Sequence, residues 1–286
     1  MPETAGALPR LSDLSGQYDG VLSDVWGVVH NGLTPYPSAV AALMEFRRAG
    51  GHVVLITNAA RTTPFVVKML DDMGVPREAY DAMVTSGDVT RALIATYKGQ
   101  AIHHVGPGTD HPILEGLGVT EAPAETAAAI VVTGLDSPAQ TPADYETRMS
   151  EWLELGLPMI CANPDKIVEV GDKMVYCAGA LADVYEERGG TVVLAGKPYP
   201  PIYKESLLAL EKAAGKAIDP RRVVAIGDSV RTDATGAAAA DLDFLFITGS
   251  IHADEIDAFG NPDPDAIKAL IAPTGARLAG FQSRLT

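Results

Sequence analysis

Several short apolar runs of the sequence end in residues that can do chemistry. The runs have the length and composition of buried parallel strands, and they cover 20–24, 52–58, 191–197, 222–228 and 244–249. At or just after their ends stand carboxylates, a hydroxyl, an amide and a cation: Asp24, Thr57, Asn58, Lys197, Asp228 and Asp233. Ligands of an open α/β sheet bind beyond the carboxyl ends of its strands, so we expect these side chains to meet at one site.

This set of side chains suits phosphoryl transfer. The reaction needs a positioned attacking oxygen, donors for the phosphate oxygens, and positive charge where negative charge develops. Asp24 can supply the attacking oxygen, and water can hydrolyse the resulting aspartyl phosphate in a second step. Asp228 and Asp233 offer the hard oxygen ligands that Mg²⁺ prefers, and Lys197 can shield the same charges. The strand ends therefore predict a magnesium and phosphate site.

Amphipathic stretches follow the first two apolar runs. Residues 38–50 and 62–74 each open with a residue suited to an N-cap and close at a glycine, as helices do. Alternating strands and helices predict an α/β fold with a Rossmann-like, doubly wound parallel sheet.

The alternation is interrupted by a different module. After 84–88 the chain shows further strand and helix patterns of its own, and the first pattern resumes at 191–197. The simplest division is a discontinuous core domain, 1–86 and 184–286, with an inserted α/β cap domain at 87–183.

Composition excludes some classes of partner. The 286-residue chain carries a formal net charge of -15, whereas nucleic-acid binding draws on clustered Lys and Arg, so we expect no nucleic-acid partner. Neither a secretory leader nor an apolar stretch long enough to span a bilayer is evident, which predicts a cytoplasmic protein with no membrane partner. Cys161 and Cys177 are too few for a disulfide framework, and we expect both to be reduced and buried.

Six segments, in order along nearly the whole chain, resemble the haloacid dehalogenase (HAD) superfamily and, within it, the class IIA, NagD-like phosphatases. They are DVWGVVHNG at 24–32, ITNAAR at 56–61, TSGD at 85–88, ANPD at 162–165, AGKP at 195–198 and GDSVRTDATGA at 227–237. The resemblance implies a Mg²⁺-dependent hydrolase, a phosphatase that acts on a small phosphorylated metabolite through an aspartyl phosphate at Asp24. Relatives commonly pair through the cap, so a homodimer is one option, while the substrate stays unidentified.

The resemblance also assigns roles to single residues. Asp24 is the nucleophile and Lys197 neutralises charge, so these two form the catalytic set. The expected metal ligands are Asp24, the main-chain carbonyl of Trp26, Asp228 and Asp233. The expected substrate and phosphate contacts are Thr57, Asn58, Ala59 and Arg61 of the core with Asn163 and Asp165 of the cap. Simple turn or surface roles remain the alternative for Arg61, Asn163 and Asp165.

One position departs from the family pattern. The usual first motif has a second aspartate that protonates the leaving oxygen, and this chain has Trp26 there. Indole cannot donate a transferable proton, so leaving-group protonation loses its usual agent. His30, four residues further on, could replace the acid or could be a packed side chain.

Two other readings follow from Trp26. One is a catalytically weak or inactive HAD-like protein that binds a phosphorylated ligand for regulation. The other is a different HAD chemistry, such as phosphonate cleavage or dehalogenation, although intact Asp228 and Asp233 disfavour a metal-free dehalogenase.

Overall fold

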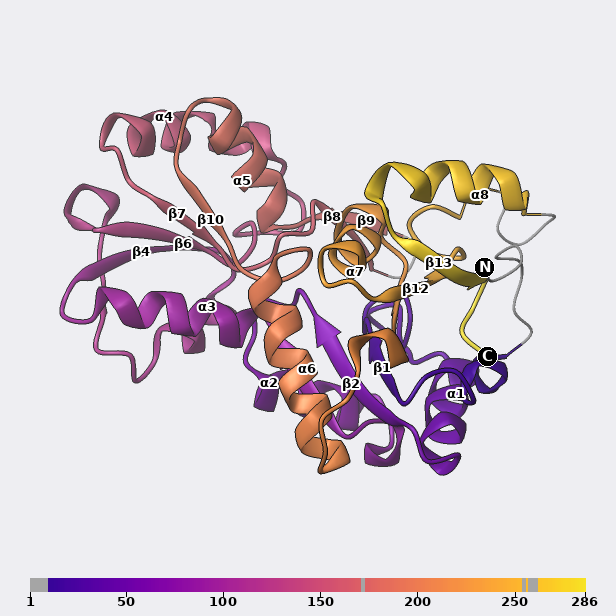
Figure 1. The fold of residues 1–286 in the computed structure, drawn as a ribbon. Helices are drawn as coiled ribbons and strands as arrows, with labels where there is room; N and C mark the ends of the chain where they lie inside the picture. Colours follow the sequence, from indigo (N-terminus) through magenta and orange to yellow (C-terminus); the bar gives the residue numbers. More distant parts are fainter. Residues whose placement is uncertain (1–9, 171–172, 254–255, 257–261) are drawn as a thin grey trace.

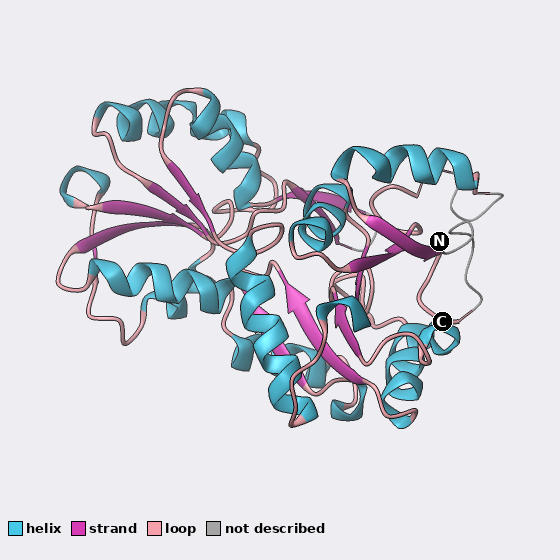
Figure 2. Ribbon diagram, viewed as in Figure 1, coloured by secondary structure: helices cyan, strands magenta, loops and turns pink. Residues whose placement is uncertain are grey.

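The computed structural model describes residues 10–170, 173–253, 256 and 262–286. They form two α/β lobes, each with its own parallel sheet (Figures 1 and 2). Among these residues, none of the helices combines the length and hydropathy needed to cross a membrane.

The larger sheet has six parallel strands in the order β13-β12-β11-β1-β2-β3. The strands are β1 (Gly20–Ser23), β2 (His52–Thr57), β3 (Ala82–Thr85), β11 (Val223–Gly227), β12 (Asp243–Ile247) and β13 (Arg277–Gln282). In the centre, Val21 lies between Val224 and Val53. β1 and β11 are buried along their whole length, which explains their nearly continuous apolar sequence.

Helices cover both faces of the six-stranded sheet. They are α1 (Pro37–Arg48), α2 (Thr63–Asp72), α6 (Pro200–Ala214), α7 (Thr235–Ala239) and α8 (Pro264–Ile271). Leu43 of α1 and Leu70 of α2 belong to one buried cluster, whereas Leu210 of α6 and Ile267 of α8 belong to another. The doubly wound, Rossmann-like fold predicted from the sequence is confirmed.

The smaller sheet has five parallel strands in the order β10-β7-β6-β4-β5. They are β4 (Ala101–Val105), β5 (Thr120–Glu121), β6 (Ala129–Val132), β7 (Met159–Cys161) and β10 (Val192–Leu194). α4 (Glu146–Glu154) and α5 (Ala178–Glu187) pack on one face through Trp152 and Tyr185. α3 (Ser86–Ile94) packs on the other face through Ile94.

An antiparallel hairpin of β8 (Ile167–Val170) and β9 (Lys173–Tyr176) leaves this lobe toward the larger one (Figure 1).

One strand assignment from the sequence was wrong. The run at 191–197 was assigned to the core sheet, but β10 pairs with β7 in the smaller sheet, with Val192 opposite Met159. The prediction also left β3 and β13 out of the core sheet. A short apolar parallel strand looks the same in either sheet, because periodicity reports burial and not the neighbouring strand. The boundaries 1–86, 87–183 and 184–286 stay a prediction, and the pairing of β10 favours a return to the core after Leu194.

Candidate active site

Three neighbouring strands bring the predicted residues to one edge of the larger sheet. Asp24 directly follows β1, Thr57 closes β2, and Asp228 directly follows β11. The Asp24 backbone N–H still donates to the Ile226 carbonyl at 2.8 Å, so the ladder of hydrogen bonds fixes where the Asp24 side chain begins. Asp24, Thr57 and Asp228 are all buried, as expected for groups at the carboxyl ends of adjacent parallel strands.

Lys197 reaches this edge from the segment after β10. Its ammonium Nζ lies 2.7 Å from Asp24 Oδ1 and 2.6 Å from Asp233 Oδ1, and only 2% of the side chain is exposed. Asn58 holds the Lys197 backbone, since its Oδ1 accepts from the Lys197 N–H at 2.7 Å and its Nδ2 donates to the Lys197 carbonyl at 3.2 Å. A buried lysine is tolerated because both carboxylates pair with it.

Three carboxylates meet around this lysine. One oxygen each of Asp24, Asp228 and Asp233 lies within 4.8 Å of the others. Burial raises the pKa of Asp24 well above its ordinary value; Lys197 opposes that rise, while Asp233 and Asp228 add to it. Burial and Asp233 likewise raise the pKa of Asp228 to about 7. The Lys197 ammonium alone cannot balance three buried carboxylates, so a further cation would reduce the repulsion among them.

The donor set fits Mg²⁺. The oxygens are hard ligands, the group is buried, and the crowded carboxylates would ionise readily around a divalent ion. The Trp26 carbonyl belongs to a backbone segment that runs against Asp228, because a Cβ at Gly27 would lie 2.1 Å from Asp228 Oδ2. Gly27 also has φ of +84°, so this close approach depends on glycine in two ways.

A π-type turn, Val230–Ala234, places the last of these acids. The Ser229 backbone N–H donates to Asp233 Oδ2 at 3.0 Å, and the Asp233 N–H donates back to the Ser229 carbonyl at 3.0 Å. A Cβ at Gly227 would lie 2.2 Å from Asp233 Cγ, so the end of β11 must be glycine for the acid to fold over it. Such turns are frequent at functional sites.

The predicted phosphate contacts are brought together, but several of their polar atoms have protein partners. Thr57 Oγ1 accepts from the Ala59 N–H at 3.2 Å. Besides holding Lys197, Asn58 donates to Asp165 Oδ1 at 3.0 Å. Asn58 is therefore placed to position Lys197 and to join the two lobes.

The predicted cap contacts also lie beside the core site. Asn163 Oδ1 accepts from the Asp165 N–H at 3.0 Å, which is the turn geometry that an Asn-Pro-Asp sequence favours. Arg61 donates to Asp110 Oδ1 at 2.8 Å and to Thr109 Oγ1 at 3.1 Å. Arg61 therefore bridges the larger lobe to the smaller one, and both Arg61 and Asn163 line the same cavity.

The comparisons with known proteins agree with this geometry. Residues 21–120 match the family model of haloacid dehalogenase-like hydrolases, and 194–272 match a second HAD-hydrolase-like model. A haloacid dehalogenase-like hydrolase from Brucella suis 1330 is 42% identical, with 98% of this chain and 100% of that chain covered and a TM-score of 0.87. The chain belongs to the haloacid dehalogenase-like hydrolases.

More distant solved structures share the fold. A possible sugar phosphatase from Cytophaga hutchinsonii is 18% identical, with 97% of each chain covered and a TM-score of 0.79. A glycerol phosphate phosphatase from Mycobacterium tuberculosis in complex with magnesium is 22% identical, with 87% of this chain and 74% of that chain covered and a TM-score of 0.64. No curated protein matches the chain.

The first-motif loop of this HAD-like hydrolase places Trp26 beside His30. The two rings are 5.1 Å apart between centroids and meet edge to face at 64°. The Gly32 N–H donates to His30 Nδ1 at 2.8 Å, so in the neutral ring Nε2 carries the proton. His30 is fully buried, and burial lowers its pKa to about 4. These observations favour the packed histidine over the substitute acid.

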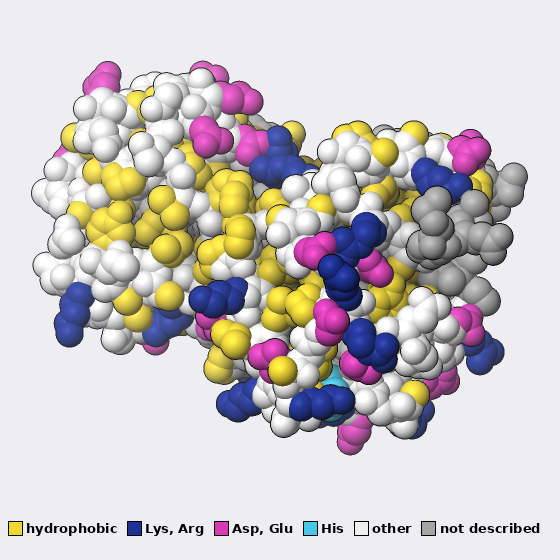
Figure 3. Space-filling view, viewed as in Figure 1, with side chains coloured by type: hydrophobic (Ala, Val, Ile, Leu, Met, Phe, Trp, Pro, Cys, Tyr) yellow, Lys and Arg dark blue, Asp and Glu magenta, His cyan; other side chains and the backbone are white. Residues whose placement is uncertain are grey.

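A cavity of about 1040 Å³ joins the HAD core site to the smaller lobe. The core residues Asp24, Trp26 and Asp228 line it, and Ile167, Val168 and Tyr176 of the β8–β9 hairpin line it from the other lobe. A notch between the lobes is visible in Figure 3, where Lys and Arg side chains over the larger lobe are interspersed with Asp and Glu.

Sequence reasoning missed the apolar hairpin and the contacts of Arg231. Arg231 donates to the Pro164 carbonyl at 2.7 Å and to Asp183 Oδ1 at 2.9 Å, which ties the segment 227–237 to the smaller lobe. Ile167 and Val168 are adjacent apolar residues, and nothing in so short a run indicates that it faces the site.

Proposed function

We propose that this chain is a magnesium-dependent phosphatase of the class IIA, NagD-like branch of the HAD-like hydrolases, acting on a small phosphorylated metabolite. The observation that carries the proposal is the buried Lys197 ammonium, which lies between Asp24 and Asp233. Asp228 belongs to the same cluster of carboxylates. A nucleophile, a cation and a metal-binding acid pair at one sheet edge are the parts that phosphoryl transfer requires.

In this proposal Asp24, the Trp26 carbonyl, Asp228 and Asp233 hold Mg²⁺. The bound ion supplies the positive charge that lets a carboxylate approach a phosphate dianion. The magnesium complex of the glycerol phosphate phosphatase from Mycobacterium tuberculosis supports the choice of ion.

The residues of the chain then carry out two displacements. A carboxylate oxygen of Asp24 attacks phosphorus, and the bond from phosphorus to the ester oxygen breaks, so that the leaving oxygen keeps the electron pair. Lys197 stays protonated, since burial alone would lower its pKa but Asp233 and Asp24 raise it well above its ordinary value. Water then attacks the phosphorus of the aspartyl phosphate, which releases inorganic phosphate and restores the Asp24 carboxylate.

Trp26 selects among leaving groups in this scheme. General acid catalysis typically contributes ~10² to 10⁴-fold, and it matters most when the leaving oxygen is a poor one such as an alkoxide. Neutral, buried His30 is a poor substitute donor. We therefore propose a substrate whose leaving oxygen needs little protonation, such as an acyl phosphate, an aryl phosphate or a phosphoanhydride.

The cavity supports the same class of substrate. The β8–β9 hairpin presents Ile167, Val168 and Tyr176 to the site, so the part of the substrate beyond the phosphate meets apolar side chains. An aryl or acyl group fits such a surface better than a polyhydroxylated sugar does.

Matched aryl and alkyl phosphates test the proposal. We expect Mg²⁺-dependent turnover of the aryl ester, slow turnover of the alkyl ester, and a loss of about 10⁴-fold or more in kcat for Asp24→Asn. Trp26→Asp should raise the alkyl rate selectively. Asp136→Asn is the control, because Asp136 follows β6 in the smaller sheet and pairs with Arg148.

Other outcomes of the same experiment are decisive. Equal and efficient turnover of both esters by the unmodified protein would contradict the leaving-group proposal. Turnover of neither ester, with phosphate still bound, would favour the second candidate, a ligand-binding regulatory protein, which the replacement of the acid by Trp26 makes reasonable.

A further inference from the structure

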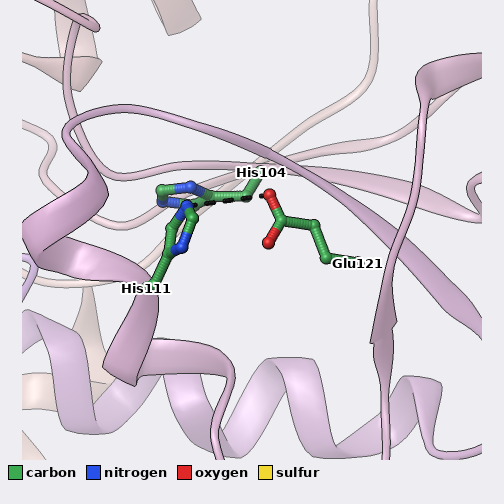
Figure 4. Close-up of side chains that lie close together, drawn as sticks. All are labelled: His104, His111 and Glu121. Atoms are coloured by element: carbon green, nitrogen blue, oxygen red, sulfur yellow. Dashed lines mark ion pairs between the residues drawn. The ribbon is translucent and has the colours of Figure 1, made fainter.

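A second group of metal-ligating side chains lies in the smaller lobe. His104 of β4, His111 of the 3-10 turn Gly108–Leu114 and Glu121 of β5 converge there (Figure 4). One ligating atom of each lies within 4.8 Å of the others. His111 Nε2 is 3.7 Å from Glu121 Oε1, and the two imidazole centroids are 4.7 Å apart. Three separate elements therefore converge on one point.

A hydrogen bond orients the buried member of the group. His104 is 7% exposed, and its Nε2 lies 2.9 Å from Thr133 Oγ1. Thr133 Oγ1 in turn donates to the Val105 carbonyl at 3.4 Å, so the hydroxyl accepts from His104. The proton then sits on Nε2 and the open lone pair on Nδ1. Metal-binding histidines are commonly oriented in this way by a second hydrogen bond.

We propose that His104, His111 and Glu121 bind a transition-metal ion of the zinc class, at a site separate from the carboxylates around Asp24. Two imidazoles and one carboxylate suit Zn²⁺, Co²⁺ or Ni²⁺, whereas Mg²⁺ favours all-oxygen sites. Tetrahedral zinc with bonds of about 2.0 Å needs ligand atoms ~3.3 Å apart. The ligand atoms here lie within 4.8 Å of one another, so they must move closer to bind the ion. The side chains of His111 and Glu121 are 50% and 46% exposed and are free to make this movement toward buried His104.

The site would brace one wall of the cavity. Thr133, which bonds to His104, and Asp110, the chain neighbour of His111, both line that cavity. Asp110 also holds Arg61 at 2.8 Å. A bound ion would fix β4, β5 and the turn between them, and with them the position of Arg61.

Calorimetric titration of the full chain with ZnCl₂ tests the site. We expect Asp228→Asn, which weakens the core metal site, to retain one Zn²⁺ per chain. Adding His111→Ala to that variant should abolish the remaining binding, and Glu121→Gln should weaken it at least tenfold. Thr133→Val should weaken it by ~10 to 100-fold, the usual effect of removing an orienting partner. Co²⁺ in place of Zn²⁺ should give the strong visible absorption of a tetrahedral complex.

Glu125→Gln is the matched control, because Glu125 is an exposed acid shortly after Glu121. Because His111 and Glu121 are exposed, we expect their variants to keep the fold, and circular dichroism checks this. Zinc affinity unchanged in His111→Ala, or lowered equally by Glu125→Gln, would overturn the proposal. Failure of the Asp228→Asn protein to bind any ion at micromolar zinc would also overturn it, and none of these results bears on phosphatase turnover.

Discussion

The two lobes have the same architecture but differ in where their charged side chains lie. Each is built on a parallel sheet covered by helices, yet the larger one buries Asp24, Lys197, Asp228 and Asp233 at the carboxyl edge of its strands. The buried clusters of the smaller lobe are apolar and include Trp152 and Tyr185; in its histidine and glutamate group His104 is buried, whereas His111 and Glu121 are exposed. The shared fold therefore does not decide where chemistry occurs; the residues that follow each strand do.

This contrast predicts the largest effect on stability at Lys197. Replacing it with methionine leaves Asp24 and Asp233 buried without their cation, and breaking such a buried pair costs about 3–5 kcal/mol. Urea unfolding monitored by circular dichroism measures the change. Lys197→Met/Asp233→Asn should recover part of the loss.

An exposed pair inside the smaller lobe provides the comparison for Lys197. Arg148→Met removes an ion pair whose partners are 35% and 41% exposed, and we expect a change below about 1 kcal/mol. Similar losses for Lys197→Met and Arg148→Met would contradict the contrast between the lobes.

His30 predicts a smaller effect that depends on pH. Burial lowers its pKa to about 4, whereas an unfolded histidine titrates near ~6.5, so the unfolded chain binds more protons between these values. The contribution of neutral His30 to the free energy of unfolding is complete above pH ~6.5. It falls by up to ~3 kcal/mol as the pH drops toward 4. The free energy of unfolding of wild type minus that of His30→Asn should fall accordingly.

The carboxylates of the core site have raised pKa values, so their effect on the pH dependence of stability is opposite to that of His30. Because both proteins contain these carboxylates, their contribution cancels in the difference. His30→Asn keeps an acceptor for the Gly32 N–H. A difference that stays flat from pH 7 to pH 4 would show that His30 has the same pKa in the folded and unfolded protein, and would contradict its burial as a neutral ring.

The smallest expected effect is at the boundary between the lobes. Arg231 and Asp183 are 39% and 23% exposed, so Arg231→Met should change the free energy of unfolding by no more than about 1 kcal/mol. We expect instead faster hydrogen exchange around 164–170 and 173–183, because Arg231 also binds the Pro164 carbonyl. Arg148→Met, which acts within one lobe, should leave that exchange unchanged.

The sequence by itself determined much of the core site. Asp24, Thr57 and Asp228 could be assigned to one edge because parallel neighbouring strands end on the same side, and that rule needs only local patterns. Hydrophobic runs also predicted the doubly wound sheet. They could not place β10, because an apolar edge strand has the same pattern in either sheet.

Only the tertiary structure decided which polar groups have partners and which segments face each other. Asn58 meets Lys197 and Asp165 across 139 and 107 residues, and Arg61 meets Asp110 across 49. No local spacing encodes such contacts, since they depend on how the strands are ordered and how the lobes meet. For the same reason the sequence does not reveal the group of His104, His111 and Glu121. Its members come together only because β5 pairs with β4.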